Sequence, residues 1–483
     1  MLALILCAVA LRSLAAAENP EWPQFRGPNS SGIAAPDASP PVEFGPSKHL
    51  LWKQPLPLGH SSPAVWGDRI FLTAFDQQSR KLELICMTAK TGAILWRRVA
   101  PANQIEETHV VSNPATGTPT VDDQRVYAYF GSYGVMTFTH AGEAQWTFPM
   151  AMPKTNHGSG ASPVLAGDLL IVNHDAIQGG YLLALERHTG KEVWRQTYPA
   201  ERRVESYSTP VVWRDQLILH RSGVVEAYQV SNGQRRWSLA ANTSGASTAV
   251  LANDIIYVAT WTNLGEDDQR PSLPSFAEMV KLYDKSDDGM IGEAEFPSEL
   301  RFAKRPELEK TPHSQNYATF KSLDRNKDGL LQESEWEAFR TRIAATTKNH
   351  GLLAIRPVDD TPEVIWRENT AIPEVPSPLL YRGRLFLVRN GGVVTCLDAK
   401  TGKVIYRARV GAPGPYFSSP VAGAGRVYLA SSEGVVTVIS AAKDQLEVLG
   451  RNELGEDIVA TPAIVRNAIY IRTSGNLYAF EGK

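Results

Sequence analysis

Short runs of apolar, β-branched and aromatic residues follow one another along most of this chain. Val126-Tyr127-Ala128-Tyr129 and Ile255-Ile256-Tyr257-Val258 are two examples. Each run is too short for a helix, and glycine, aspartate, asparagine or arginine between the runs permits tight turns. The pattern therefore predicts antiparallel strands joined by hairpins, and it excludes a helical solenoid.

The strands belong to a repeating unit whose first landmark is a proline at the start of a strand. Proline fits this position because it forfeits no ladder hydrogen bond there. A degenerate copy of the landmark reads Ser247-Thr248-Ala249. The other seven are Pro63, Pro119, Pro163, Pro210, Pro378, Pro420 and Pro462. Eight copies, each with four short strands and a period of roughly 45 residues, predict an all-β fold, an eight-bladed β-propeller.

The second landmark is an aromatic residue four places after a turn glycine. Such a side chain can pack between neighbouring sheets and bury on the order of 200 Å². Cys86 and Cys396 each lie ten residues before this aromatic. We expect them to be small core residues of different blades rather than a disulfide pair. The glycine and aromatic pairs are Gly92/Trp96, Gly142/Trp146, Gly190/Trp194, Gly233/Trp237 and Gly402/Tyr406, and Pro362/Trp366 keeps the spacing with proline in place of glycine.

The two ends of the chain carry complementary parts of one blade. Leu477–Phe480 reads as a third strand with no fourth strand after it, and Leu50–Lys53 reads as an orphan fourth strand with Trp52. We predict that this N-terminal strand completes the last blade and closes the ring, which removes the exposed sheet edges. The propeller is then residues 47–264 and 350–483, preceded by a leader at 18–46.

An insertion of about 85 residues, 265–349, interrupts blade five between its second and third strands. It contains two twelve-residue loops with oxygen side chains at positions 1, 3 and 5, glycine at 6 and glutamate at 12. Calcium prefers six to eight oxygen ligands, and such a loop wraps the ion with them. The expected ligands are Asp284, Ser286, Asp288, Met290 (backbone carbonyl) and Glu295 in loop one, and Asp324, Asn326, Asp328, Leu330 (backbone carbonyl) and Glu335 in loop two.

Helical apolar spacing flanks these loops, at Phe276–Tyr283, Tyr317–Leu323 and Trp336–Ile343. The whole insertion resembles a paired EF-hand module. Loop one has Ser286 at position 3 and Gly292 at position 9, and Pro297 should shorten its exit helix. We therefore expect loop one to bind calcium more weakly than loop two, with affinities on the order of 10⁻⁴–10⁻³ M.

The repeat itself resembles a known family. LLALERHTGKEVW (Leu182–Trp194) is similar to the repeat of the pyrroloquinoline quinone (PQQ) propellers, and WPQFRGPNSSG (Trp22–Gly32) resembles the opening of exported bacterial PQQ-like propellers. That superfamily includes quinoprotein alcohol dehydrogenases and the propeller lipoprotein of the outer-membrane β-barrel assembly machinery. The resemblance implies the fold and says little about activity.

Quinoprotein chemistry, as the resemblance implies it, needs a quinone, a calcium ion on the quinone and an aspartate base. The family typically stacks the quinone between a tryptophan and a disulfide of adjacent cysteines. This chain has no adjacent cysteines and no c-type haem motif. We therefore expect calcium and no PQQ, and we hold a PQQ-dependent oxidoreductase with a degenerate site as the alternative.

Charge and the N-terminus bear on location and partners. The net charge is −2, which argues against nucleic acid or an anionic membrane as the main partner. Residues 1–17 read as a signal peptide ending at Ala15-Ala16-Ala17. Leu6 before Cys7 argues against a lipid anchor. We expect a periplasmic or secreted monomer with no membrane span.

Strand alternation also predicts which loops share a face. Loops between second and third strands, and loops between blades, emerge on the face that carries the insertion. His60, His109, Asn156, His157, His174 and Asp175 all lie in such loops. They either form a polar ligand site, with the insertion beside or over it, or only satisfy loop backbone groups. Together these features predict a binding or scaffolding protein rather than an enzyme, and assembly of outer-membrane proteins is a weaker alternative.

Overall fold

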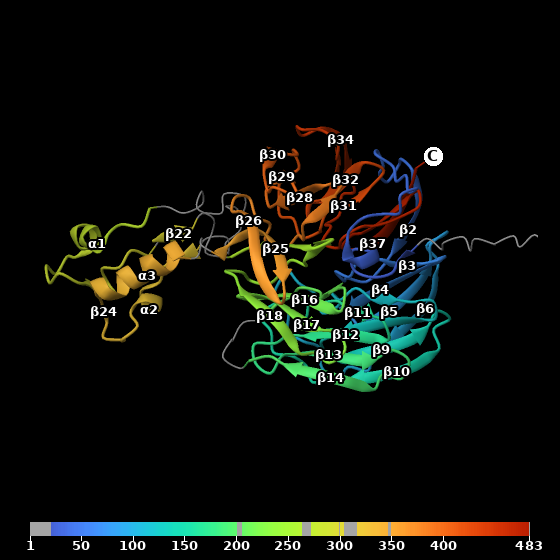
Figure 1. Cartoon of the computed structure of the whole chain (residues 1–483), viewed down its shortest axis with the longest axis horizontal. Helices are drawn as coiled ribbons and strands as arrows, with labels where there is room; N and C mark the ends of the chain where they lie inside the picture. The colour runs from blue at the N-terminus through green and yellow to red at the C-terminus, as the bar shows by residue number, and fades with distance from the viewer. Residues whose placement is uncertain are drawn as a thin grey trace, which may run out of the picture.

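The computed structural model describes residues 21–199, 205–262, 272–298, 300–303, 316–345 and 349–482. The predicted signal peptide at 1–17 lies outside these ranges. Figure 1 shows a ring of β-sheets with a small helical module beside it. None of the helices among the described residues is long and apolar enough to cross a membrane.

The ring consists of eight antiparallel blades, as the repeat predicted (Figure 1). Blades one to four contain β3 (Ala64–Trp66), β4 (Arg69–Asp76), β5 (Lys81–Thr88) and β6 (Ile94–Val99); β7 (Thr120–Val121), β8 (Arg125–Phe130), β9 (Gly134–Thr139) and β10 (Ala144–Pro149); β11 (Val164–Ala166), β12 (Leu169–His174), β13 (Tyr181–Glu186) and β14 (Glu192–Thr197); and β15 (Val211–Trp213), β16 (Gln216–Arg221), β17 (Val224–Gln229) and β18 (Arg235–Ala240).

The remaining blades follow the same order from the inside of the ring outward. Blades five to eight contain β19 (Val250–Ala252), β20 (Ile255–Thr260), β25 (Gly351–Val358) and β26 (Thr361–Glu368); β27 (Leu379–Tyr381), β28 (Arg384–Arg389), β29 (Val393–Asp398) and β30 (Val404–Arg409); β31 (Val421–Gly423), β32 (Arg426–Ala430), β33 (Val435–Ser440) and β34 (Val448–Glu453); and β35 (Ala463–Val465), β36 (Ala468–Arg472), β37 (Asn476–Glu481) and β2 (Leu50–Pro55). The predicted closure by the N-terminal strand is confirmed, because Trp52 of β2 pairs with Ala479 of β37.

A closed circle of hydroxyl groups joins the blades around the axis. The serine or threonine at each landmark accepts a hydrogen bond from the backbone N–H of the equivalent residue in the preceding blade, at 2.9–3.2 Å. Thr461 N donates to Ser62 Oγ at 3.1 Å and joins blade eight to blade one. The buried members are Ser62, Thr118, Ser162, Thr209, Thr248, Ser377, Ser419 and Thr461. Thr248 belongs to the degenerate landmark, so the hydroxyl, rather than the proline, is what all eight blades share.

The landmark tryptophans connect each blade to the next one. Trp194 Nε1 donates to Val230 O at 2.9 Å, and its ring lies on the turn glycine of blade four, Gly233. Blade five has Pro362 where blades one to four and blade six have the turn glycine, and the contact with the preceding blade differs there. Blade five offers Trp237 no such turn, and the Trp237 indole donates instead to Gln216 of its own blade at 3.2 Å. Cys86 and Cys396 are buried free thiols in blades one and six, as predicted.

The leader crosses the end of the central channel opposite the insertion. β1 (Glu21–Trp22) pairs with β3 of blade one, and η1 (Pro28–Ser30) follows it. Arg26, fully buried, donates to Pro378 O of blade six at 2.6 Å. Further on, Ala34 N donates to Ala422 O of blade seven at 2.8 Å. The leader thus covers this end of the channel and is bound by blades on both sides of the ring. We call this end of the channel the leader face.

The insertion leaves blade five between β20 and β25, as predicted, and the opposite face of the ring is called the insertion face. Its core includes Phe276, Met279, Trp336 and Phe339. Figure 1 shows it extending sideways from the ring. Its elements are α1 (Phe276–Tyr283), β21 (Ile291–Gly292), β22 (Arg301–Ala303), β23 (Asn316–Tyr317), α2 (Phe320–Leu323), β24 (Leu330–Leu331) and α3 (Glu333–Ala345).

Two details of the insertion differ from the sequence prediction or refine it. The helix expected from Tyr317 begins only at Phe320, because Tyr317 pairs with Arg301 in a short sheet. After loop one the described residues form turns instead of a helix, which agrees with the effect expected of Pro297.

Candidate functional site

Three of the predicted face residues meet on the insertion face, where the loops before blades two, three and four come together. The rings of His109 and His157 lie 4.8 Å apart between centroids. His157 Nδ1 is 2.9 Å from the Tyr207 hydroxyl, and that hydroxyl donates to Glu205. The arrangement is a histidine–tyrosine–carboxylate relay beside a second histidine.

Glu205 is the fixed end of this relay. Asn156 donates to it twice, from its backbone N at 2.8 Å and from Nδ2 at 3.1 Å. Burial favours a raised pKa for Glu205, but interactions with His157, Tyr207 and Asn156 outweigh burial and lower the pKa to about 2. Glu205 is therefore an ionised carboxylate with a side chain only 2 % exposed, whereas the His157 side chain is 46 % exposed. The relay can orient the His157 ring toward a polar ligand.

His174 and Asp175 lie beneath this surface rather than on it. His174 Nδ1 is 2.9 Å from the Tyr129 hydroxyl, and the imidazole stacks on Tyr181. Burial, with a smaller contribution from Arg195, lowers the pKa of His174 to about 4. Asp175 pairs with buried Arg221 at 3.0 Å. Both residues therefore support the loops and do not reach the surface.

His60 occupies a third, separate environment between blades eight and one. Its backbone N donates to Ala115 O at 3.0 Å. Burial, and secondly the charge of Arg472, lower the pKa of His60 to about 4. The Arg472 guanidinium is itself buried and donates to the carbonyls of Ser61 and Thr73. The structure thus brings His109, Asn156 and His157 together and leaves His60 apart.

Glu106 is a buried carboxyl near the relay that sequence reasoning missed. Ser159 donates to its Oε2 from both backbone N and Oγ at 3.0 Å, while Oε1 has no hydrogen-bond partner among the described residues. Burial raises the pKa of Glu106 to about 7, against the opposing effect of the Ser159 bonds. Glu205 and Tyr207 were missed as well, although they directly precede a landmark, Ser208-Thr209-Pro210.

The two acidic loops of the insertion share one backbone conformation. Position 1 accepts from the glycine N–H at position 6 in both loops, Asp284 from Gly289 at 2.9 Å and Asp324 from Gly329 at 3.0 Å. These glycines have φ values of 78° and 83°. The residues at position 8 of the two loops pair with each other, because Ile291 lies opposite Leu331 in the β21–β24 ladder.

The last acidic residue of each loop also binds its own backbone. Glu295 accepts from Lys285 N and Ser286 N at 2.9 Å, and Glu335 accepts from Arg325 N at 2.8 Å. Within the described ranges, no three His, Cys, Asp or Glu side chains are gathered as a metal site. The loop conformation and the all-oxygen donor set fit calcium. An ionised carboxylate has about four lone-pair sites, so it can accept a backbone N–H and still bind the ion.

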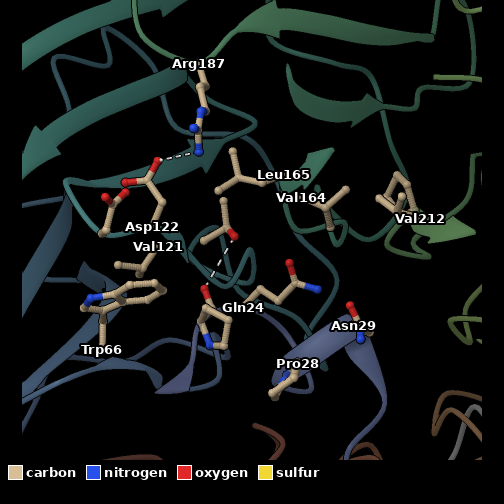
Figure 2. A pocket seen from close by; sticks show the side chains of 14 residues that line it. Gln24, Pro28, Asn29, Trp66, Val121, Asp122, Val164, Leu165, Arg187 and Val212 are labelled. Atoms are coloured by element: carbon tan, nitrogen blue, oxygen red, sulfur yellow. Dashed lines mark hydrogen bonds and ion pairs between the residues drawn. The ribbon is translucent and has the colours of Figure 1, made fainter. Parts of the chain in front are cut away.

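A cavity of about 430 Å³ lies on the leader face, between the leader and the inner strands of blades two to four. Figure 2 shows Gln24 and Asn29 reaching toward it from the leader and the Asp122–Arg187 pair on another wall. Arg187 Nη1 is 3.4 Å from Asp122 Oδ2. The lining is Pro23, Gln24, Pro28, Asn29, Trp66, Thr120, Val121, Asp122, Asp123, Val164, Leu165, Arg187, Pro210 and Val212. The sequence held no signal for this cavity, because it depends on the path of the leader.

Comparison with known proteins shows wide similarity in fold. The chain is similar to BamB from Moraxella catarrhalis, at 13% identity over 89% of this chain and 97% of that one, with a TM-score of 0.54. Quinohemoprotein alcohol dehydrogenase from Comamonas testosteroni matches at 11% identity, 96% and 81% coverage, and a TM-score of 0.56. A europium-containing methanol dehydrogenase matches at 12% identity, 96% and 99% coverage, and 0.54. No curated protein matches the chain.

The family comparison is more specific than these structural likenesses. The family model described as outer membrane protein assembly factor BamB matches residues 44–270 and 354–483. The gap between these segments covers most of the insertion, and the matched segments contain the strands of all eight blades except the first three residues of β25. The chain therefore belongs to the family of the outer membrane protein assembly factor BamB, with an insertion in blade five, most of which the family model does not cover.

Proposed function

We propose that the chain is an exported, calcium-binding PQQ-like propeller that acts as a binding or scaffolding protein. The observation that carries the calcium part is that two loops paired through β21 and β24 share the hydrogen bond from the position-6 glycine to the position-1 aspartate. Such pairing is typical of EF-hand modules, and the proposed ligands are the oxygen groups named above for each loop. Bound calcium would neutralise acidic side chains that otherwise repel one another.

Calcium titration of the full chain tests this part. After removal of metal by a chelator, isothermal titration with Ca²⁺ should show two sites, of which the loop-two site is tighter. Glu335→Gln should abolish that tighter site because it removes the carboxylate expected to bind through both oxygens. Glu333→Gln is the matched control, since Glu333 stands in α3 two residues away and is not at a ligand position. An unchanged titration in Glu335→Gln would refute the assignment.

The binding part of the proposal concerns the insertion face. The His157–Tyr207–Glu205 relay and the neighbouring His109 ring offer hydrogen-bonding groups held by a buried carboxylate. Val110, next to His109 in the chain, is 88 % exposed and so is accessible to a partner at this surface. Membership of a family named for outer-membrane protein assembly favours a protein partner in the cell envelope, and a role in that assembly is the second candidate.

Site-specific photo-crosslinking in cells tests the binding face. A photoreactive residue at Val110 should give a discrete crosslinked partner, and Val358, 50 % exposed on β25, is the control position. His157→Ala should abolish the Val110 adduct, and Glu205→Gln should weaken it by releasing the relay. Asp175→Ala is a poor probe here, because it would leave buried Arg221 without its partner. An adduct insensitive to His157→Ala would argue against this face.

The oxidoreductase alternative has its own discriminating test. Purified protein mixed with PQQ and calcium would show a quinone spectrum and dye-linked alcohol oxidation if the chain were a quinoprotein. The proposal expects neither signal, and either one would overturn it.

A further inference from the structure

The inner strand of each blade presents one free edge to the central channel, and the leader already pairs with three of these edges. The second residue after the landmark proline is the pairing position. Val65 of blade one lies opposite Trp22. In blade two Val121 N donates to Pro23 O at 2.8 Å, and in blade seven Ala422 N donates to Gly32 O at 2.8 Å. The leader therefore binds the ring by adding an extended segment to sheet edges.

The same position in blades three and four is occupied by Leu165 and Val212, which line the cavity beside the leader. Their strand register matches that of blade two: Leu165 lies opposite Leu170 and Val212 opposite Leu217, as Val121 lies opposite Val126. Their backbone N–H and C=O groups must then point away from the second strand, toward the channel. Among the described residues, no hydrogen bond from the leader reaches them.

The three positions that pair with the leader are more deeply buried than the two beside the cavity. Val65, Val121 and Ala422 are buried under the leader, at 0 %, 2 % and 0 % exposed. Leu165 and Val212 are only half-buried. The cavity thus leaves two edge positions accessible that the leader covers in other blades.

The other residues that line the cavity limit the kind of ligand that can bind there. Gln24 and Asn29 carry carboxamides, which offer a donor and an acceptor in one plane, as a peptide group does. Asp122, Asp123 and Arg187 together contribute one net negative charge. Val164 and Val121 also line the cavity and supply apolar surface. An uncharged or basic ligand with a peptide backbone and apolar side chains satisfies all three features.

We propose that this cavity binds an extended peptide segment of another protein, which pairs its backbone with the edges at Leu165 and Val212. The peptide segment would pair with the inner strands of blades three and four in the way that the leader pairs with those of blades one, two and seven. This site lies on the face opposite the relay, so it does not depend on the function proposed above.

The test uses the full chain and a defined probe, the acetylated and amidated pentapeptide Thr-Val-Thr-Val-Thr. Isothermal titration should show binding to the wild type. Leu165→Pro and Val212→Pro each remove one edge N–H, which an edge strand tolerates, and should weaken binding at least tenfold. Leu251→Pro is the matched control, because it makes the same change at the same register in blade five, away from the cavity. It should bind like the wild type.

Two further measurements keep the result decisive if a proline variant fails to fold. Leu165→Trp should fill the cavity and abolish binding while retaining the wild-type melting temperature. Two peptides, each N-methylated at alternate amides, test the backbone pairing. Methylation of the amides that pair with the sheet edges should abolish binding, and methylation of the other amides should leave binding unchanged. The proposal is overturned if no peptide binds at millimolar concentration, if Leu165→Trp binds normally, or if both N-methylated peptides bind equally. A dimer that Val212→Pro dissociates would assign these edges to a second copy and overturn it as well.

Discussion

Two glycines with almost the same backbone angle show how differently the ring and the insertion are built. Gly190 in blade three has φ 73°, and Gly329 in the second acidic loop has φ 83°. An added Cβ at Gly190 would lie 2.5 Å from the Trp146 ring, whereas one at Gly329 would meet nothing within 4 Å. The ring needs glycine for packing between blades as well as for a turn, and the loop needs it for the turn alone.

The same contrast extends to polar groups. In the ring, the landmark hydroxyl of each blade bonds to the backbone of the preceding blade, and an indole such as that of Trp194 bonds to the backbone of the next, so each interface depends on its neighbours. In the acidic loops, carboxylates bond to the backbone of their own loop, so these contacts stay within one short segment of the chain. We therefore expect single substitutions to lower the stability of the ring, whereas the stability of the insertion should depend mainly on the ion that it binds.

The largest expected effect comes from alanine at the two glycines. Gly190→Ala combines left-handed strain of about 1 kcal/mol with overpacking against Trp146, for a loss of roughly 2–4 kcal/mol in the free energy of unfolding. Gly329→Ala introduces the strain alone, about 1 kcal/mol. Urea denaturation followed by circular dichroism measures both. Equal losses in the two variants would refute the difference between ring and insertion.

Glu106 is a buried carboxyl of the ring whose Oε1 has no hydrogen-bond partner among the described residues. Its ionisation should make the stability of the ring depend on pH. Its folded pKa of about 7 lies above the ordinary value of 4.5, so its contribution to stability is complete below pH 4.5 and is lost as pH rises through 7. The loss amounts to roughly 3 kcal/mol by pH 9. Glu106→Gln mimics the protonated form and should match the wild type at pH 4.5 but exceed its unfolding free energy at pH 9.

Paired urea titrations at the two pH values measure this difference between wild type and variant. Glu107→Gln, an exposed neighbour, is the control and should show no such pH-dependent gap. A constant difference between Glu106→Gln and wild type across pH would mean that the Glu106 carboxyl ionises normally in the fold.

The sequence predicted the ring well because each blade repeats the residues that hold it. The Gly–Trp spacing and the landmark reflect contacts between adjacent blades, which recur wherever the repeat does. Even the closing strand at Leu50–Pro55 was readable, since Trp52 keeps the repeat position. The relay partners Glu205 and Tyr207 lie in irregular loops without such repetition. The cavity depends on contacts such as Arg26 with Pro378, which join residues 352 positions apart and leave no local pattern.

Loss of one indole N–H should have a smaller effect, and two tryptophans offer a matched pair. Trp194 Nε1 donates to Val230 O, whereas Trp366 Nε1 is buried without a partner among the described residues. The equivalent carbonyl, Ala399 O, is taken by the Tyr257 hydroxyl at 2.8 Å. Phenylalanine at either site removes similar apolar contact, but only Trp194→Phe leaves a carbonyl unpaired.

Trp194→Phe should therefore lose about 1–2 kcal/mol more unfolding free energy than Trp366→Phe. Urea denaturation followed by circular dichroism avoids the change in fluorescence that each substitution brings. If Trp366→Phe lost as much as Trp194→Phe, the inter-blade hydrogen bond would contribute nothing measurable.

The smallest expected effect sharpens the comparison inside the insertion itself. Loop one has Ser286 where loop two has Asn326, and its position 9 is Gly292 where loop two has Gln332. Ser286→Asp adds a carboxylate at position 3 and should tighten calcium binding at loop one by up to about tenfold, or about 1.4 kcal/mol, because affinity follows ligand charge. The ring should melt at an unchanged temperature without calcium. An unchanged affinity in isothermal titration would mean that position 3 of loop one does not face the ion, and the two loops would then differ in more than their side chains.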